Sequence, residues 1–279
     1  MRLRSLLFVP GDRPERMAKA LGLGADALIL DLEDLVAPER KHEARRAATE
    51  FLAAPREEDA PALFVRINPI DSGDAAADLA ALAGLSPDGI VLPKAEGEES
   101  VRHLLDRHPG DYRVLPVASE TPAAVFRLGT FAPVAPRLAG ITWGAEDLPA
   151  AIGAATAREA DGSYTDPYKM VRAMTLFGAH AAGVAAIETV FPDFRDLDGL
   201  AAYAARGRRD GFAGMMAIHP TQVAVINAAF SPSEAELDHA RRVVALFEAN
   251  PGAGALQLDG KMVDAPHLKA ARRVLGAEG

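Results

Sequence analysis

Hydrophobic residues gather in short runs that recur at regular intervals along this chain. Each run spans four to six residues, is rich in Val, Ile and Leu, and is apolar on both faces instead of alternating with polar residues. That pattern is typical of strands that are buried on both sides of a parallel sheet. Eight such runs are predicted to be strands: residues 5–9, 27–31, 62–67, 89–92, 113–118, 138–143, 185–190 and 215–218.

Segments with helical spacing lie between these runs. Several begin with a proline at the first helical position, as in Thr121-Pro122 and Asp166-Pro167. Alternation of strand and helix eight times over roughly 220 residues predicts an α/β fold, a (β/α)8 TIM barrel. An open doubly wound sheet is the alternative, but polar groups at so many strand ends favour the barrel. The predicted helices include residues 39–51, 74–85, 99–105, 168–182, 197–206 and 221–229.

The chain continues past the eighth unit with a segment that a barrel does not need. A helix is expected over residues 231–250, a hairpin over 257–262 with an Asp259-Gly260 turn, and a last helix over 263–275. We therefore divide the chain into a barrel, residues 1–230, and a C-terminal helical extension with a hairpin, residues 231–279. The extension is expected to reach over the active site or to pack on a neighbouring subunit.

The composition of the chain excludes several kinds of binding partner and several kinds of catalytic or metal site. The net charge of −9 argues against nucleic acids and anionic membranes as partners. The absence of cysteine excludes disulfides, thiolate nucleophiles and Cys-ligated zinc or iron–sulfur sites. The apolar run near the N-terminus is too short for a signal peptide or a membrane span, which need about 7 and about 20 apolar residues. We therefore expect a cytoplasmic protein.

Acidic side chains follow several of the predicted strands, where the active site of a barrel lies. Glu33 and Asp34 follow the second strand, Glu120 the fifth, and Glu146 and Asp147 the sixth. Carboxylates gathered at one mouth repel each other unless a cation lies among them, and oxygen ligands suit Mg²⁺, with Mn²⁺ as an alternative. Glu120 and Asp147 would stand on adjacent strands about 5 Å apart and could share one ion. The alternative is that Asp147 caps a helix and Glu120 is a solvated loop residue.

Basic residues occur at the same strand ends. Arg66 could clamp a substrate carboxylate through two hydrogen bonds, or pair with the acids of the second strand. Lys94 is a candidate Schiff-base nucleophile, but nearby acids would favour its protonated form. His219 is either an acid/base group or a helix-entry residue. Arg13 and Arg16 could hold phosphates outside the mouth, or form a solvated helix face.

These residues stand in motifs that resemble the citrate lyase beta-subunit-like branch of the HpcH/HpaI aldolase superfamily, which includes malyl-CoA and citramalyl-CoA lyases. Each motif is weak alone, but the set follows the family order over nearly the whole chain. The matching stretches are Leu7-Phe-Val-Pro-Gly11, Leu30-Asp-Leu-Glu-Asp34, Val65-Arg-Ile-Asn68, Leu92-Pro-Lys94, Glu120-Thr121, Gly144-Ala-Glu-Asp147, Ile218-His-Pro-Thr-Gln222 and Asp259-Gly-Lys-Met-Val-Asp264.

The resemblance implies a barrel that is usually trimeric or a dimer of trimers. It implies that Glu120 and Asp147 hold Mg²⁺, that Arg66 binds the carboxylate of a 2-oxo acid, and that Glu33 and Asp34 lie near the metal and its waters. Acyl-CoA and 2-oxo acid are the small-molecule partners that it implies, and a homotrimer or hexamer is the expected assembly.

The resemblance also implies roles for residues outside the acidic cluster. The tail hairpin would project Asp264 into a neighbouring subunit's site as a catalytic group. The CoA pocket would lie near the first loop, which favours the phosphate-binding role for Arg13 and Arg16. His219 is also counted among the substrate-binding residues. One departure is Leu35, where relatives often have a small residue, which bears on the shape of the substrate pocket.

The expected function is a Mg²⁺-dependent carbon–carbon lyase. It would cleave or form a 3-hydroxyacyl-CoA such as malyl-CoA or citramalyl-CoA, giving acetyl-CoA and a 2-oxo acid, with Asp264, Arg66, Glu33 and Asp34 as catalytic residues. Three alternatives stay open: a citryl-thioester lyase subunit of a citrate lyase complex, a metal-dependent aldolase acting on free 2-oxo acids, and a binding protein without catalysis.

Overall fold

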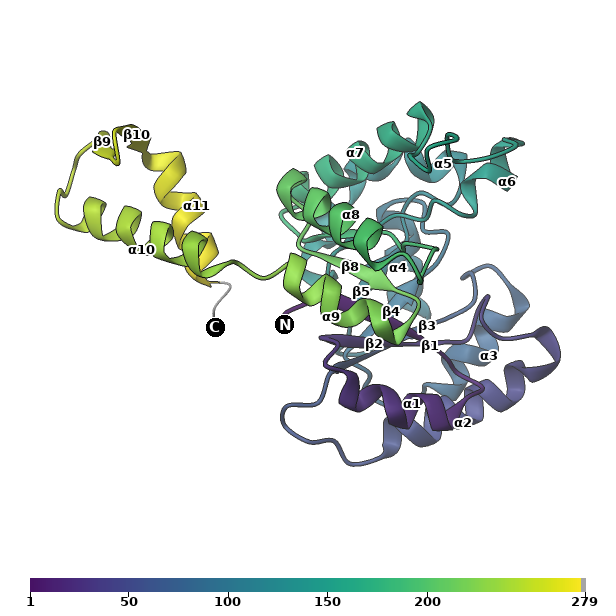
Figure 1. Ribbon diagram of the computed structural model, residues 1–279. Coiled ribbons are helices and arrows are strands. Elements are labelled where there is room, and N and C mark those ends of the chain that lie inside the picture. Colours follow the sequence, from purple (N-terminus) through teal and green to yellow (C-terminus); the bar gives the residue numbers. More distant parts are fainter. Residues whose placement is uncertain (277–279) are drawn as a thin grey trace. The chain divides into compact units, whose positions relative to one another are not determined.

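The computed structural model describes residues 1–276, which form two compact units (Figure 1). The first unit, Met1–Ala228, contains eight parallel strands in the order β5-β4-β3-β2-β1-β8-β7-β6. The strands are β1 Ser5–Pro10, β2 Ala27–Asp31, β3 Ala62–Arg66, β4 Gly89–Leu92, β5 Arg113–Pro116, β6 Ile141–Thr142, β7 Ala186–Glu188 and β8 Gly214–Ala217.

The two ends of this sheet, β5 and β6, also meet. Val117 forms a parallel bridge with Thr142, and Val114 forms one with Leu138. The backbone N–H of Ala118 donates to the carbonyl of Thr142 at 2.9 Å. These contacts nearly close the sheet, so the predicted (β/α)8 barrel is confirmed and the open doubly wound alternative is wrong.

Helices surround the strands (Figure 1). The connection from β5 to β6 differs from the others because it contains two short 3₁₀ segments, Leu128–Thr130 and Ala132–Arg137. Pro136 lies inside the second segment, and proline lacks the N–H that a regular helix needs. The α-helices of this unit are α1 Pro14–Ala20, α2 Lys41–Ala53, α3 Gly73–Ala81, α4 Glu98–Arg107, α5 Pro122–Val125, α6 Leu148–Ile152, α7 Asp166–Ala181, α8 Leu197–Asp210 and α9 Pro220–Ala229.

Alternating positions of the strands fill the barrel interior. Leu6 and Phe8 of β1 belong to one buried cluster with Ala27 and Ile29 of β2 and with Phe64 of β3. Side chains two residues apart on a strand lie on the same face. The next inward positions on β2 and β3 are Asp31 and Arg66, at the carboxyl ends of those strands. The packing of the core therefore directs two charged side chains into the mouth of the barrel.

The second unit contains two helices and a hairpin: α10 Glu234–Glu248, β9 Ala255–Leu258, β10 Lys261–Asp264 and α11 Ala265–Gly276. Asp259 and Gly260 connect the two strands with φ angles of 51° and 77°, as a two-residue hairpin turn requires. Val263 packs into a small core with Ala240, Val243 and other apolar residues of α10 and α11. Among residues 1–276, no helix combines the length and the apolar character that crossing a bilayer requires.

Candidate active site

Arg66 and Asp31 form a buried ion pair at the mouth of the barrel. They are register partners on β3 and β2. The Nε and Nη2 groups of Arg66 donate to Oδ1 and Oδ2 of Asp31, both at 2.7 Å. The third nitrogen, Nη1, lies 3.1 Å from Oε2 of Glu33 and 4.0 Å from Oδ2 of Asp34. Arg66 therefore pairs with the acids of the second strand and the loop after it, which was one of its two predicted roles. Its Nη1 group is the nitrogen that lies nearest Glu33 and Asp34.

Glu33 is a buried carboxylate held by cations on two sides. Besides its contact with Arg66, its Oε1 lies 3.5 Å from Nζ of Lys94. Within residues 1–276, neither oxygen of this carboxylate accepts a hydrogen bond. Burial raises the pKa of Glu33 to about 7, and the charge of Asp34 also raises it, against the cations of Arg66 and Lys94. A carboxyl group with that pKa can exchange a proton near neutral pH.

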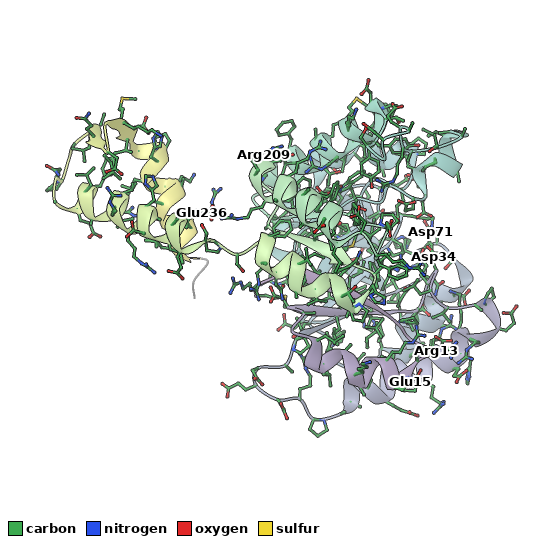
Figure 2. The ribbon with its side chains drawn as sticks, in the orientation of Figure 1. Arg13, Glu15, Asp34, Asp71, Arg209 and Glu236 are labelled. Atoms are coloured by element: carbon green, nitrogen blue, oxygen red, sulfur yellow. The ribbon has the colours of Figure 1, made fainter. Side chains whose placement is uncertain are left out.

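Asp34, in contrast, lies toward solvent. Its side chain, labelled in Figure 2, is 60% exposed. Its contact with Arg66 is at the limit of an ion pair. Asp34 therefore contributes negative charge at the mouth, whereas Glu33 is the acid placed inside it.

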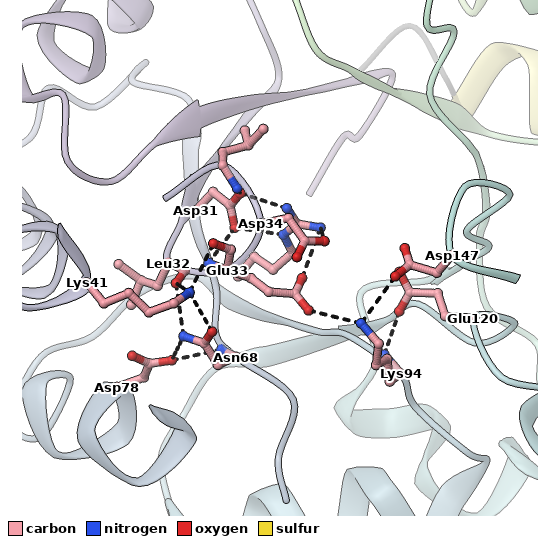
Figure 3. A network of polar contacts seen from close by, with 12 residues as sticks. Asp31, Leu32, Glu33, Asp34, Lys41, Asn68, Asp78, Lys94, Glu120 and Asp147 are labelled. Atoms are coloured by element: carbon pink, nitrogen blue, oxygen red, sulfur yellow. Dashed lines mark hydrogen bonds and ion pairs between the residues drawn. The ribbon is translucent and has the colours of Figure 1, made fainter. Parts of the chain in front are cut away.

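A second polar network fixes the loop that carries Glu33 (Figure 3). Nζ of Lys41 donates to the carbonyls of Leu32 and Glu33, at 2.8 and 3.1 Å, and to Oδ1 of Asn68 at 2.7 Å. The Nδ2 group of Asn68 in turn donates to Oδ2 of Asp78 and to the carbonyl of Leu32. Because Lys41 belongs to α2 and Asp78 to α3, the loop after β2 is tied to two helices of the outer layer.

Lys94 connects the acids of three strand ends (Figure 3). Its backbone N–H donates to Oε2 of Glu120 at 2.6 Å, and its Nζ lies 3.3 Å from Oδ1 of Asp147. The φ angle of Lys94 is +50°, a left-handed conformation that non-glycine residues seldom adopt. This conformation lets one residue contact Glu120 through its backbone and Glu33 and Asp147 through its ammonium group.

Glu120 is not a solvated loop residue, and the side chain of Asp147 does not cap a helix, although the sequence allowed both roles. Glu120 is only 5% exposed, so it is not a solvated loop residue. Asp147 occupies the N-cap position of α6, but in the described part of the chain its side chain makes no capping hydrogen bond. Both carboxylates instead lie beside Lys94.

The local electrostatics favour a protonated lysine among crowded acids. Burial, together with the charges of Asp147 and Glu33, raises the pKa of Glu120 to about 8, although the hydrogen bond from the N–H of Lys94 lowers it. Burial alone would lower the pKa of Lys94, but the charges of Glu33, Asp147 and Glu120 raise it overall. A Schiff-base nucleophile must become a neutral amine, so these surroundings oppose that role.

Gly144 makes room for the side chain of Glu120. A Cβ atom at position 144 would lie 2.7 Å from Cγ of Glu120 and 3.0 Å from its Oε1. Unbonded carbon atoms do not approach each other to 2.7 Å, so a larger residue at position 144 would displace the side chain of Glu120. The glycine of the Gly144-Ala-Glu-Asp147 motif therefore has a packing role in this site.

The oxygen donors at the mouth fit a magnesium ion. Within residues 1–276, no three acidic or histidine side chains converge on one metal position. Glu120 and Asp147 would thus supply two ligands, and substrate and water would complete the shell, as is common for Mg²⁺. Burial disfavours the ionised form of Glu120, and a divalent cation beside the carboxylate would favour that form.

A cavity of about 500 Å³ lies between α1 and the ends of β1 and β8. Its lining includes Arg16 and Lys19 of α1, Leu35 of the loop after β2, and His219 at the start of α9. The ring of His219 stacks on that of Phe194 with centroids 4.7 Å apart. Two of the predicted substrate-binding residues, Arg16 and His219, therefore lie at one cavity.

Arg13 lies elsewhere. It precedes α1 at the N-cap position, where Figure 2 labels it, and its Nε is 3.7 Å from Oδ1 of Asp12. Among the described residues it is not part of the cavity lining.

Asp264 belongs to the second unit, where it ends β10 directly before α11. Its Oδ1 lies 2.5 Å from Nδ1 of His267. The hydrogen bond with His267 lowers the pKa of Asp264, against a small effect of burial. The carboxylate is thereby kept ionised.

The sequence profile of the family described as HpcH/HpaI aldolase/citrate lyase matches residues 4–220. This chain belongs to that family. The match covers all eight strands of the barrel, so the predicted resemblance is confirmed, and the family assignment makes the protein a lyase-type enzyme.

Named relatives match almost the whole chain. A "citrate lyase subunit beta-like protein" of Mycobacterium tuberculosis is 39% identical over 273 residues, which is 98% of this chain and 94% of that protein. A "(3S)-malyl-CoA thioesterase" of Cereibacter sphaeroides is 36% identical over 280 residues, covering 98% and 93%. The crystal structure of protein CitE from M. tuberculosis in complex with magnesium, acetoacetate and coenzyme A matches with a TM-score of 0.83 and 37% identity. That match covers 99% of this chain and 98% of the other. Both expected ligands, magnesium and coenzyme A, are thus found in a solved relative.

Sequence reasoning gave no role to two residues that organise the site. Asp31 holds Arg66, and the alternation Ala27, Ile29, Asp31 along β2 is a signal that could have placed it inside the barrel. Lys41 holds the backbone of Glu33, and no local pattern predicts that contact, since it joins α2 to a loop.

Proposed function

We propose that this protein is a magnesium-dependent carbon–carbon lyase that cleaves or forms a 3-hydroxyacyl-CoA such as malyl-CoA or citramalyl-CoA. Cleavage would give acetyl-CoA and a 2-oxo acid. The observation that carries the proposal is the grouping of Arg66, Glu33, Glu120 and Asp147 at one mouth beside a cavity lined by basic groups. Such a site can take an anionic acyl group and the phosphates of CoA together.

Glu120 and Asp147 would hold the magnesium ion, which would polarise the emerging carbonyl and lower the pKa of the substrate hydroxyl. The Nη1 group of Arg66 would bind the substrate carboxylate. Asp31 keeps this guanidinium in one orientation through two hydrogen bonds, so the carboxylate is bound in a defined place.

Glu33 is the base in this mechanism, because its pKa near 7 leaves it ionised in part at neutral pH. In cleavage Glu33 takes the proton of the substrate hydroxyl. The bond between the hydroxyl carbon and the carbon next to the thioester carbonyl breaks at the same time. The electron pair of that bond passes into the thioester as an enolate, and the hydroxyl carbon becomes the carbonyl of the 2-oxo acid. Lys94 keeps its proton and balances the charge of Glu33 and Asp147.

Asp264 then completes the reaction at the enolate carbon. In condensation the ionised carboxylate of Asp264 removes a proton from the acetyl carbon. In cleavage the reverse transfer needs protonated Asp264, which takes its proton from water and delivers it to the enolate carbon to give acetyl-CoA. The bond to His267 keeps the ionised form dominant before condensation. We propose that Asp264 serves the site of a neighbouring subunit in a homotrimer or hexamer. The domain division at residue 230 belongs to this proposal, with the extension packing on the neighbour.

The test is product analysis with purified protein and malyl-CoA, citramalyl-CoA and citryl-CoA, with Mg²⁺ and with EDTA. We expect release of a 2-oxo acid that EDTA abolishes and added Mg²⁺ restores. Glu120→Gln should lose the activity. Glu146→Gln is the matched control, because this neighbouring acid is 57% exposed and pairs with Arg158 instead. Absence of a 2-oxo acid from all three esters would overturn the proposal for free CoA esters, and a carrier-protein citryl thioester would then be assayed.

A second function, hydrolysis of malyl-CoA, is favoured by the similarity to the C. sphaeroides thioesterase. Hydrolysis breaks the carbon–sulfur bond and releases malate and a free thiol, whereas lyase cleavage releases glyoxylate and acetyl-CoA without a free thiol. Measuring thiol and 2-oxo acid in the same reaction separates the two activities.

A further inference from the structure

We propose that Lys41 is a positioning residue, which sets the place of the Glu33 carboxylate without contacting the substrate itself. This inference rests on the proposed function, because it concerns the base of that reaction. It goes beyond that function by making the rate of the chemical step depend on a contact outside the mouth. That contact joins the first residue of α2 to the loop after β2 (Figure 3).

The ammonium group of Lys41 has a partner for each of its three N–H bonds. Its Nζ donates to the carbonyl oxygens of Leu32 and Glu33, at 2.8 and 3.1 Å, and to Oδ1 of Asn68 at 2.7 Å. An ammonium group has three donors and no acceptor, so these bonds use all that it offers. Lys41 therefore acts on the site through the loop that it holds, and not as a ligand of the substrate.

The carboxylate of Glu33 takes its place from its own backbone. In the part of the chain that the structure describes, neither of its oxygens accepts a hydrogen bond, and its contacts with Arg66 and Lys94 are ion pairs of 3.1 and 3.5 Å. The backbone of Glu33 is fixed on both sides, because its N–H donates to Oδ1 of Asp31 at 2.9 Å and its carbonyl accepts from Lys41. Loss of the ammonium group releases the carbonyl side, and the side chain moves with it.

Lys41 is anchored in turn by a buried acid of the outer layer. The backbone N–H and the Nδ2 group of Asn68 both donate to Oδ2 of Asp78, at 2.8 and 2.7 Å. Because Asp78 accepts from Nδ2, the Oδ1 atom of Asn68 is the one that meets Lys41. Asp78 is fully buried and also accepts from Nε of Arg45 at 2.6 Å. Hydrogen bonds shielded from water in this way hold their partners firmly.

The position of Lys41 is unfavourable for the helix that contains it. The helix α2 begins at Lys41, and the positive end of a helix dipole favours acids over cations. Residues that break a local preference are expected where a functional site needs them. The position therefore fits a role in the site better than a role in the stability of α2.

The groups that would bind the substrate do not depend on Lys41. Arg66 is oriented by Asp31, and the proposed magnesium ligands belong to other strand ends. Displacement of Glu33 therefore lengthens the path of the hydroxyl proton without removing a binding group. A misplacement of about 1 Å costs about 100-fold in rate. The loss should appear in kcat and leave KM and the Mg²⁺ affinity at their wild-type values.

The experiment uses the absence of cysteine from this chain. Lys41→Cys introduces a single thiol, which 2-bromoethylamine alkylates to a side chain that has the length of lysine and ends in an ammonium group. The substrate is whichever of the three CoA esters wild type cleaves fastest, with Mg²⁺ present. We expect kcat of Lys41→Cys to fall by about 10- to 100-fold, with KM and Mg²⁺ affinity unchanged. Alkylation, verified by mass spectrometry, should restore kcat.

Arg46→Cys, with and without alkylation, is the matched control, because Arg46 is exposed on the same helix and pairs with Glu50 of that helix. Its kcat should equal that of wild type. Lys41→Gln, with the same expected loss of kcat, replaces Lys41→Cys if that variant does not fold. A folded Lys41 variant with the kcat of wild type overturns the inference. A loss in KM or Mg²⁺ affinity, or a loss that complete alkylation does not restore, also overturns it. Wild type that releases no 2-oxo acid from any ester overturns the proposed function instead.

Discussion

The carboxylate of Asp31 holds the guanidinium of Arg66 through two parallel bonds of 2.7 Å. These residues end adjacent strands in register, so the geometry of the sheet sets their separation. The pair occupies Nε and Nη2 and leaves Nη1 beside Glu33. Arg66 is therefore oriented before a substrate arrives. Less side-chain conformational entropy is then lost when the substrate binds.

Replacing Asp31 with Asn should disorder this arrangement. An amide accepts through one oxygen only and brings no negative charge, so one of the two bonds is lost. A hydrogen bond to a charged group contributes about 1.5–3 kcal/mol, so we expect kcat/KM to fall by about 10- to 150-fold. Steady-state kinetics with malyl-CoA measure this, and a melting curve checks the fold. Kinetics equal to those of wild type would show that Asp31 does not position Arg66.

Gly144→Ala should weaken magnesium binding. The added Cβ would lie 2.7 Å from Cγ of Glu120 and would displace the carboxylate that is proposed to bind the metal. We expect Mg²⁺ affinity, measured by isothermal titration calorimetry, to fall by about 10-fold or more, as when one metal ligand's support is lost. Gly129→Ala is the control, because nothing lies within 4 Å of a Cβ there. Equal affinities for the two variants would contradict the role of Gly144.

The stability of the metal-free protein should fall as the pH rises from about 4.5 to about 8. The folded-state pKa values of Glu33 and Glu120 are raised to about 7 and about 8 from 4.5. The folded state therefore binds more protons than the unfolded state in this window, and the free energy of unfolding decreases with pH. Ionised Glu120 is also the form that binds metal, so Mg²⁺ should raise the melting temperature more at pH 8 than at pH 5.5.

Thermal melts in EDTA and in Mg²⁺ at the two pH values measure this difference. Glu120→Gln should reduce both the pH dependence in EDTA and the effect of Mg²⁺ at pH 8. A melting temperature in EDTA that rises between pH 5.5 and 8 would be incompatible with the assigned direction of the shifts.

Asp264→Asn should abolish proton transfer while leaving the barrel intact. General acid–base groups contribute about 10²- to 10⁴-fold, and an amide cannot exchange a proton, so we expect kcat to fall within that range. Mg²⁺ affinity should stay at the wild-type value, because Asp264 belongs to the second unit and the proposed metal ligands to the first. Turnover close to that of wild type would exclude Asp264 as the proton donor.

The hydrophobic pattern predicted the eight strands, and the polar groups at the strand ends favoured the barrel over an open sheet. Strands buried on both faces have a strong local signature, and the runs 27–31 and 89–92 match β2 and β4 residue for residue. The parallel order of the strands then brings their carboxyl ends together, so Arg66, Glu120 and Asp147 could be assigned to one mouth. The connection between β5 and β6 was less predictable, because its short 3₁₀ segments have no regular period.

Only the tertiary structure determined which charged side chains pair with one another. Each of these contacts joins segments that are distant in sequence. Arg66 of β3 binds Asp31 of β2, and Lys94 contacts carboxylates from three other strand ends. Leu35, in the loop after β2, lines a cavity beside α1. A sequence pattern reports the face on which a side chain lies, because that depends on local backbone geometry. Partners across the barrel depend on the register of strands and the packing of helices, which long-range burial determines.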